Sequence, residues 1–183
     1  DVYHVAVNTD IFVEAVYKTY AFAARIGFFA DDIQFVDLGV GKGKSLMLLA
    51  LKYADKISNY PALGIDISPS LIRQAHLNIQ SLDVEAHFQL INTDASNLVD
   101  YVQSNTLMLY AYNRFGRIVL ERTICGISQL SNIFIIYVEP VHSDVLYSLG
   151  FTRIYFRKRL SFESKAREYS LFFRPSLAFD YVS

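Results

Sequence analysis

Apolar segments of strand length alternate with helix-like segments along most of this 183-residue chain. Several of them, such as Ile133 to Val138 (IFIIYV), are apolar at almost every position, as expected for strands covered on both faces. Alternation of such strands with helices predicts an α/β fold: a doubly wound, mostly parallel sheet with helices on both faces. The expected strands are 33–38, 62–66, 87–91, 106–112, 133–138, 152–160 and 168–174.

Helices are expected between these strands, and residue types at their ends support them. Pro69 suits the first turn of a helix, with Ser68 as its N-cap, and Gly150 is typical of a helix end. No helix separates the last two strands, so we expect a C-terminal antiparallel hairpin in a seven-stranded, Rossmann-like sheet. The expected helices are 44–53, 69–79, 117–127 and 141–149. We divide the chain into an N-terminal helical segment, 1–32, and a main domain, 33–183.

Composition excludes several classes of protein. Hydrophobic residues make up 52% and charged residues 19%, which excludes a disordered chain. A net charge of −1 argues against a dedicated nucleic-acid binder, and no stretch of about 18 uncharged apolar residues predicts a membrane span. Cys125 is the only cysteine and the four histidines are scattered, so we expect no disulfide and no metal site. A reducing, cytoplasmic setting fits best, and the start at Asp1 without a signal-peptide pattern indicates processing or trimming upstream.

A glycine loop at the end of the first strand is the strongest functional signal. It reads Asp37-Leu38-Gly39-Val40-Gly41-Lys42-Gly43, and its glycines allow the backbone to turn sharply beside a ligand. Free N–H groups at the start of the next helix are expected to bind a polar ligand. A dinucleotide fingerprint would need glycine at Lys44, and a Walker A loop would need it at Leu38. The remaining interpretations are a D-x-G-x-G-x-G cofactor loop or a tight structural turn, with Lys42 and Lys44 solvated.

This loop resembles the first motif of the class I S-adenosylmethionine-dependent methyltransferases. The resemblance implies that the loop cradles the methionine end of S-adenosylmethionine (SAM), the expected cofactor. It also implies a ribose-binding carboxylate at Asp66 in GIDIS, with Ile67 beside it, because a carboxylate can accept two hydrogen bonds from a vicinal diol. In NTDAS, Asp94 and Ala95 resemble the pair that meets the adenine. The alternatives without ligand binding are a surface acid at Asp66 and a helix N-cap at Asp94. The implied cofactor-binding residues are Asp37, Gly39, Gly41, Gly43, Asp66, Ile67, Asp94 and Ala95.

The segment after the fourth strand resembles the family's fourth motif. Asn113 and Phe115 align with an Asn-Pro-Phe pattern found in bacterial members of unassigned substrate, and with an Asn-Phe stretch in histone lysine methyltransferases of the same sheet fold. The resemblance implies that they are the catalytic residues, holding a target amine beside the methyl group. Arg114 replaces the expected proline, which would help to fix the carbonyl geometry. The alternative is that Asn113 caps the next helix and Phe115 packs in the core.

His142 and the arginines of the last hairpin each have a functional and a purely structural interpretation. His142 follows the fifth strand, where Glu139 departs from an Asn-Pro-Val-His pattern in the bacterial relatives; it is either a general base or, as we prefer, a surface side chain in the first turn of a helix. In the last hairpin, strand alternation would put Arg153, Arg157 and Arg159 on one face with Tyr155. This face would either bind an anionic partner or, as we prefer, protect a sheet edge from pairing.

The sequence therefore predicts a SAM-dependent methyltransferase whose acceptor is unidentified, either a small molecule or a protein, with an amine nitrogen as the favoured target. One alternative is a SAM-binding module without catalysis, consistent with the altered fourth motif. The other is an enzyme with a related fold that binds NAD or ATP.

Overall fold

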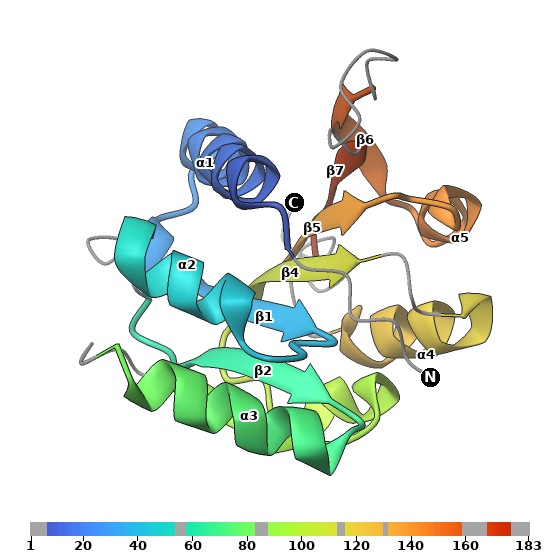
Figure 1. The fold of residues 1–183 in the computed structure, drawn as a ribbon. Helices are drawn as coiled ribbons and strands as arrows, with labels where there is room; N and C mark the ends of the chain where they lie inside the picture. The colour runs from blue at the N-terminus through green and yellow to red at the C-terminus, as the bar shows by residue number, and fades with distance from the viewer. Residues whose placement is uncertain are drawn as a thin grey trace.

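A computed structural model of the chain describes residues 7–53, 58–82, 88–112, 116–129, 132–158 and 168–176. Within them, seven strands form one sheet in the order β3-β2-β1-β4-β5-β7-β6 (Figure 1). The strands are β1 (Ile33–Leu38), β2 (Ala62–Asp66), β3 (Phe88–Asn92), β4 (Thr106–Tyr112), β5 (Asn132–Val138), β6 (Thr152–Arg157) and β7 (Tyr169–Arg174). The helices are α1 (Thr9–Arg25), α2 (Lys44–Tyr53), α3 (Pro69–Gln80), α4 (Arg117–Ile127) and α5 (Ser143–Ser148), with short 3₁₀ turns η1 (Ala30–Asp32) and η3 (Ala95–Asp100).

The strand directions confirm the predicted fold class. β1 to β5 run parallel, whereas β7 is antiparallel to both β5 and β6. The chain winds outward from β1 to β3 and then crosses back to β4, so the strand order reverses between β1 and β4. Ligand sites of doubly wound sheets lie at the carboxyl ends of the strands beside such a reversal.

Helices cover both faces of the sheet, as expected. Helices α1, α2 and α3 bury their apolar residues in one core on one face, whereas η3, α4 and α5 share a second core on the other (Figure 1). The central strands β1, β4 and β5 are buried at every position apart from the last residue of β4. This double burial explains why their sequences are apolar without alternation. No helix in the described part of the chain is long and apolar enough to cross a membrane.

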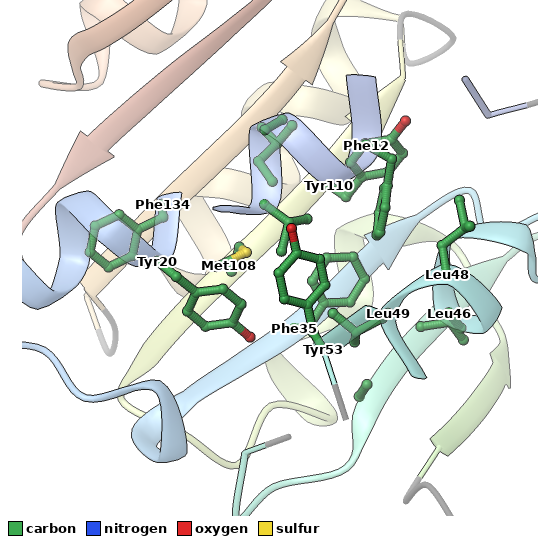
Figure 2. Close-up of a cluster of buried hydrophobic side chains, with 14 of the residues drawn as sticks. Phe12, Tyr20, Phe35, Leu46, Leu48, Leu49, Tyr53, Met108, Tyr110 and Phe134 are labelled. Atoms are coloured by element: carbon green, nitrogen blue, oxygen red, sulfur yellow. The ribbon is translucent and has the colours of Figure 1, made fainter. Parts of the chain in front are cut away.

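Helix α1 contributes aromatic side chains to the first core. The Phe12 ring lies 5.1 Å from that of Tyr110 on β4 and 6.0 Å from that of Phe35 on β1, in edge-to-face contacts (Figure 2). The helix begins after Asn8, whose side chain accepts a hydrogen bond from the Ile11 N–H at 3.1 Å. Because Phe12 is fully buried, the N-terminal helix and the sheet share one hydrophobic core.

Local details differ from the expectations at three places. Ser68 takes the N-cap position of α3 without a capping hydrogen bond from its side chain, and its hydroxyl pairs with that of Ser70 at 2.9 Å. Helix α5 begins only at Ser143, so His142 precedes the helix. Strand β6 ends at Arg157, whereas the sequence suggested a longer strand.

A register shift in β6 overturns the predicted row of arginines. The pairing with β7 skips a residue between Arg153 and Tyr155, as at a β-bulge. The Arg153 guanidinium therefore lies over the Phe156 ring, at 5.0 Å, whereas Arg157 pairs with Glu14 of α1. The inserted residue reverses the alternation, so Arg153 and Arg157 face opposite sides of the sheet. Arg159 lies outside the described residues.

Gly64 in β2 allows the loop after β1 to approach the sheet closely. A Cβ added at this buried position would lie 2.7 Å from Val40 Cγ2, 2.8 Å from a Leu90 methyl carbon and 2.9 Å from a Leu46 methyl carbon. Such distances are well below van der Waals contact, and three neighbours would have to move together. The absence of a side chain at Gly64 therefore fixes how near Val40 comes to β2.

We expect Gly64→Ala to lower the free energy of unfolding by about 1–3 kcal/mol, because overpacking a buried site forces its neighbours out of place. Urea denaturation measures the change. Gly126→Ala is the matched control: Gly126 lies on the exposed side of α4, its added Cβ would have no neighbour closer than 3.8 Å, and alanine favours helix by up to about 1 kcal/mol. Equal stabilities of the Gly64→Ala variant and the wild type would contradict the close approach.

Candidate functional site

A cavity of about 540 Å³ opens at the carboxyl ends of the parallel strands, beside the reversal between β1 and β4. Its volume lies within the range of small-molecule sites. Seven of the predicted cofactor residues line it: Asp37, Gly39, Gly41, Asp66, Ile67, Asp94 and Ala95. Gly43 does not line it, and Asn113 and Phe115 lie outside the described residues.

Three glycines of the loop have backbone angles that other residues rarely adopt. The φ angles are 83° at Gly39, 55° at Gly41 and 83° at Gly43, all in the left-handed region. Gly43 has a second constraint, because an added Cβ would lie 3.3 Å from the Cβ of Ala75 on α3. Gly43 therefore serves the packing of the loop against α3.

Most of the loop amides are already bonded within the protein. The N–H groups of Gly39 and Val40 both donate to the Ile65 carbonyl, at 2.8 and 2.9 Å, and that of Gly43 donates to the Val40 carbonyl at 2.9 Å. The Gly41 N–H donates to Asp66 Oδ2 at 3.0 Å. These four N–H groups are therefore satisfied by the protein itself, three of them at the end of β2 and that of Gly43 within the loop. The free N–H groups expected from the sequence were those at the start of α2, which begins at Lys44, and the four bonded amides precede it.

Asp66 therefore has two roles in the geometry of the site. Its Oδ2 atom holds the glycine loop, and its Oδ1 atom accepts a hydrogen bond from the Ser68 N–H at 2.9 Å. The residue is half-buried and lines the cavity. Each carboxylate oxygen can accept more than one hydrogen bond, so acceptor capacity remains on the carboxylate.

Asp37 is a buried carboxyl at the base of the cavity, only 3% exposed. The Ser45 hydroxyl donates a hydrogen bond to its Oδ2 atom. Burial raises the pKa of Asp37 to about 7; the Ser45 hydrogen bond opposes this shift, and the charge of Asp66 adds to it. The side chain therefore changes its protonation state near neutral pH.

Asp94 acts as a helix cap, which was one of the two predicted interpretations. Its Oδ1 atom accepts hydrogen bonds from the Ser96 N–H at 2.8 Å and the Ser96 hydroxyl at 2.7 Å, at the start of η3. The Ser96 backbone hydrogen bond is the largest cause that lowers the pKa of Asp94. Asp94 and the buried Ala95 also line the cavity, so capping fixes the position of this wall.

Other residues complete the cavity wall without any sequence motif. Tyr110 and Tyr112 lie toward the carboxyl end of β4, where lining residues are expected in a sheet of this kind. Val7 precedes α1, and no sequence feature indicated that it lines the cavity. The Lys44 ammonium donates a hydrogen bond to the Val7 carbonyl at 2.7 Å and fixes Val7 at the cavity wall. Lys44 is thus half-buried and bonded, contrary to the expectation that it is solvated, whereas Lys42 is exposed as expected. Both lysines line the cavity, and the remaining lining residues are Leu38, Val40, Ile65, Thr93, Gly116 and Val119.

Neither His142 nor Glu139 is among the residues that line the cavity. His142 is half-buried just before α5, and its carbonyl accepts a hydrogen bond from the Val145 N–H. Glu139 follows the last residue of β5, Val138, and has a φ of 51°, which is uncommon for a residue other than glycine. The chain thus makes a sharp, strained turn there, immediately beyond the carboxyl end of β5.

Comparison with known proteins relates this architecture to solved structures. No protein-family model and no curated protein matches the sequence. An rRNA methylase from Streptococcus thermophilus superposes with a TM-score of 0.61 and 16% identity, over 88% of this chain and 96% of that one. A SAM-dependent methyltransferase from Clostridium acetobutylicum gives 0.63 and 9%, over 93% of each chain. A Streptococcus mutans protein described as a methyltransferase, in complex with S-adenosylhomocysteine (SAH), gives 0.61 and 11%, over 87% and 97%. The chain therefore has the Rossmann-like fold of the class I SAM-dependent methyltransferases.

The buried Asp37 predicts a pH dependence of stability. The ordinary pKa of this carboxyl is 3.8, and the folded value is about 7. Between these values the unfolded chain releases the proton while the folded protein keeps it, so the contribution of Asp37 to stability falls as the pH rises and levels off above about 7. In Asp37→Asn this loss disappears. We expect the variant to be more stable than the wild type by about 1–3 kcal/mol near pH 8, with a smaller difference near pH 5.

Urea denaturation of both proteins across this pH range measures the difference, and Asp100→Asn, an exposed aspartate at the end of η3, is the control. A difference between Asp37→Asn and the wild type that stays constant with pH would show that Asp37 does not titrate in this window.

Proposed function

We propose that this chain binds SAM and transfers its methyl group to an acceptor. The observation that carries the proposal is the cavity at the carboxyl ends of β1 and β2, where the glycine loop, Asp66 and the Asp94–Ala95 pair meet. Each of these follows a successive strand of the sheet, as the resemblance to the methyltransferases requires. The similar fold of proteins named for SAM-dependent methyl transfer, one of them in complex with SAH, supports the same assignment. The proposed methyltransferase domain is 33–183, with 1–32 as an N-terminal addition.

The walls of the cavity suit the three parts of SAM. The glycine loop lies where the methionine end would bind, and Asp66 retains acceptor capacity for the ribose hydroxyls. Ile67 is 72% exposed although it is a large apolar residue, and it lines the cavity next to Asp66. A purine placed between Ile67 and the Asp94–Ala95 wall would cover this apolar surface, and burying such surface stabilises the complex.

Methyl transfer would proceed as an in-line displacement. A lone pair of the acceptor forms the new bond to the methyl carbon, the electrons of the carbon–sulfur bond return to the sulfur, and neutral SAH is left. The acceptor loses a proton to water or to a nearby base. The chain's part is to align the two reactants, because a well-oriented pair reacts far faster than a freely diffusing one.

The acceptor side of the proposal depends on the segment after β4. Tyr112 ends that strand on the cavity wall, and Asn113 and Phe115 follow it directly. We propose these two as the catalytic residues that hold the acceptor, in the manner of the bacterial Asn-Pro-Phe-type methyltransferases. An amine nitrogen remains the favoured target. The name of the Streptococcus thermophilus neighbour, an rRNA methylase, also makes RNA an acceptor to be tested.

Calorimetry with SAM, SAH, NAD and ATP tests the cofactor, and transfer of a labelled methyl group to amines, proteins and ribosomal RNA tests the reaction. We expect SAM and SAH to bind and to raise the apparent stability of the protein, since both bind only the folded state. Detection of SAH as the product identifies methyl transfer. Binding without transfer to any acceptor would favour the non-catalytic module, and binding of NAD or ATP in place of SAH would overturn the proposal.

Asp66→Asn gives a residue-level test of the ribose contact. The variant keeps one side-chain acceptor and loses the other, so we expect its affinity for SAH to fall by about 1–3 kcal/mol. Asp10→Asn changes an exposed aspartate of α1 and serves as the control. Unchanged SAH affinity in Asp66→Asn, measured by calorimetry, would remove Asp66 from the ribose site.

A further inference from the structure

Two lysines line the cavity in different environments: Lys42 in the glycine loop and Lys44 at the start of α2. The Lys44 ammonium donates one of its three N–H groups to the Val7 carbonyl, which fixes its position. The Lys42 side chain is exposed. Within the part of the chain that the structure describes, the Lys42 ammonium makes no hydrogen bond or ion pair. Of these two lysines, Lys42 is therefore the one whose ammonium is not held by a protein group and can turn toward a ligand.

The backbone at Lys42 is held in place although the side chain is exposed. Asn78 of α3 donates a hydrogen bond from its side-chain amide to the Lys42 carbonyl, at 2.9 Å. Gly43, next along the chain, packs against Ala75 of the same helix. Because α3 contacts the loop at Lys42 and at the next residue, the lysine projects from a defined point at the cavity rim.

Four loop amides near Lys42 are not available as donors to an anion. The N–H groups of Gly39, Val40 and Gly41 donate to Ile65 and Asp66, and that of Gly43 donates to the Val40 carbonyl. An anionic ligand group beside these four positions cannot bind to their amides, whereas a lysine ammonium is a strong donor to a carboxylate.

The charges at the loop end of the cavity match an α-amino acid. Asp37 presents a carboxyl group from the end of β1, and Lys42 presents a positive charge from the loop. An α-amino acid group carries one ammonium and one carboxylate on the same carbon. Opposite charges in the wall can therefore orient such a group, with its ammonium toward Asp37 and its carboxylate toward Lys42.

We propose that Lys42 binds the α-carboxylate at the amino-acid end of the cofactor and makes the site selective for adenosyl thioethers and sulfonium compounds that retain this carboxylate. The inference rests on the proposed function, since it places the methionine end of the cofactor at the loop. It goes further by assigning one residue to one charged group. Lys42 is here a specificity-determining residue of the binding step, with no part in the methyl transfer itself.

The test compares two ligands that differ only in the carboxylate: SAH and its decarboxylated analogue, which keeps the amine. Calorimetry measures both affinities for the wild type, Lys42→Met and Lys42→Arg. We expect the wild type to prefer SAH by about threefold to tenfold, a modest factor because Lys42 is exposed. Lys42→Met should lose this preference through weaker binding of SAH alone, and Lys42→Arg should retain it.

Lys52→Met is the matched control, because Lys52 is an exposed lysine near the other end of α2. It should leave both affinities unchanged. In the wild type, raising the salt concentration should weaken SAH binding more than binding of the analogue, and Lys42→Met should remove this difference.

The outcomes separate this inference from the proposed function. Equal affinity of the wild type for SAH and the analogue, or an equal loss of both in Lys42→Met, would overturn the role of Lys42 and leave SAM binding intact. Failure of the wild type to bind either ligand would overturn both.

Discussion

The return of the glycine loop onto the end of β2 is the constraint on which the site depends. The Ile65 carbonyl accepts two amides of the loop, and Asp66 accepts a third, from Gly41. The backbone can reach these acceptors only by turning through left-handed conformations, which explains the glycines in the loop. It can lie this close to β2 only because Gly64 has no side chain in its way. The position of the cavity beside the loop therefore depends on this close approach of the loop to β2.

Much of the fold follows from local sequence. Apolar runs predicted the buried parallel strands, and the cofactor-type loop and Asp66 fall at strand ends, where a sheet of this kind has its cavity. These features are local because each depends on a few adjacent residues. Periodicity fails where one inserted residue changes the pattern: the bulge between Arg153 and Tyr155 separates arginines that simple alternation would have put together.

Contacts between distant parts of the chain account for what sequence reasoning missed in the site. The hydrogen bond from Lys44 to the Val7 carbonyl joins residues 37 positions apart, and no motif marks either of them. Burial of Asp37 is likewise a property of the packed sheet, although the residue itself was placed in the site from its position before the glycines. The hydrogen bonds from the loop amides to Ile65 and Asp66 depend on the pairing of β1 with β2. The sequence could therefore indicate the loop without showing which of its N–H groups are free.

The two carboxyl groups of the cavity have different surroundings, and this difference suits them to different tasks. Asp66 receives two backbone N–H groups that hold its position at the rim, where it can accept further hydrogen bonds. Asp37 is buried with one hydroxyl donor, Ser45, and burial raises its pKa. A cationic ligand group above Asp37 would favour its ionised form and offset the cost of burying that charge. On the proposed function, the ammonium and sulfonium of SAM would supply such cations, so cofactor binding would lower the pKa of Asp37 back toward its ordinary value.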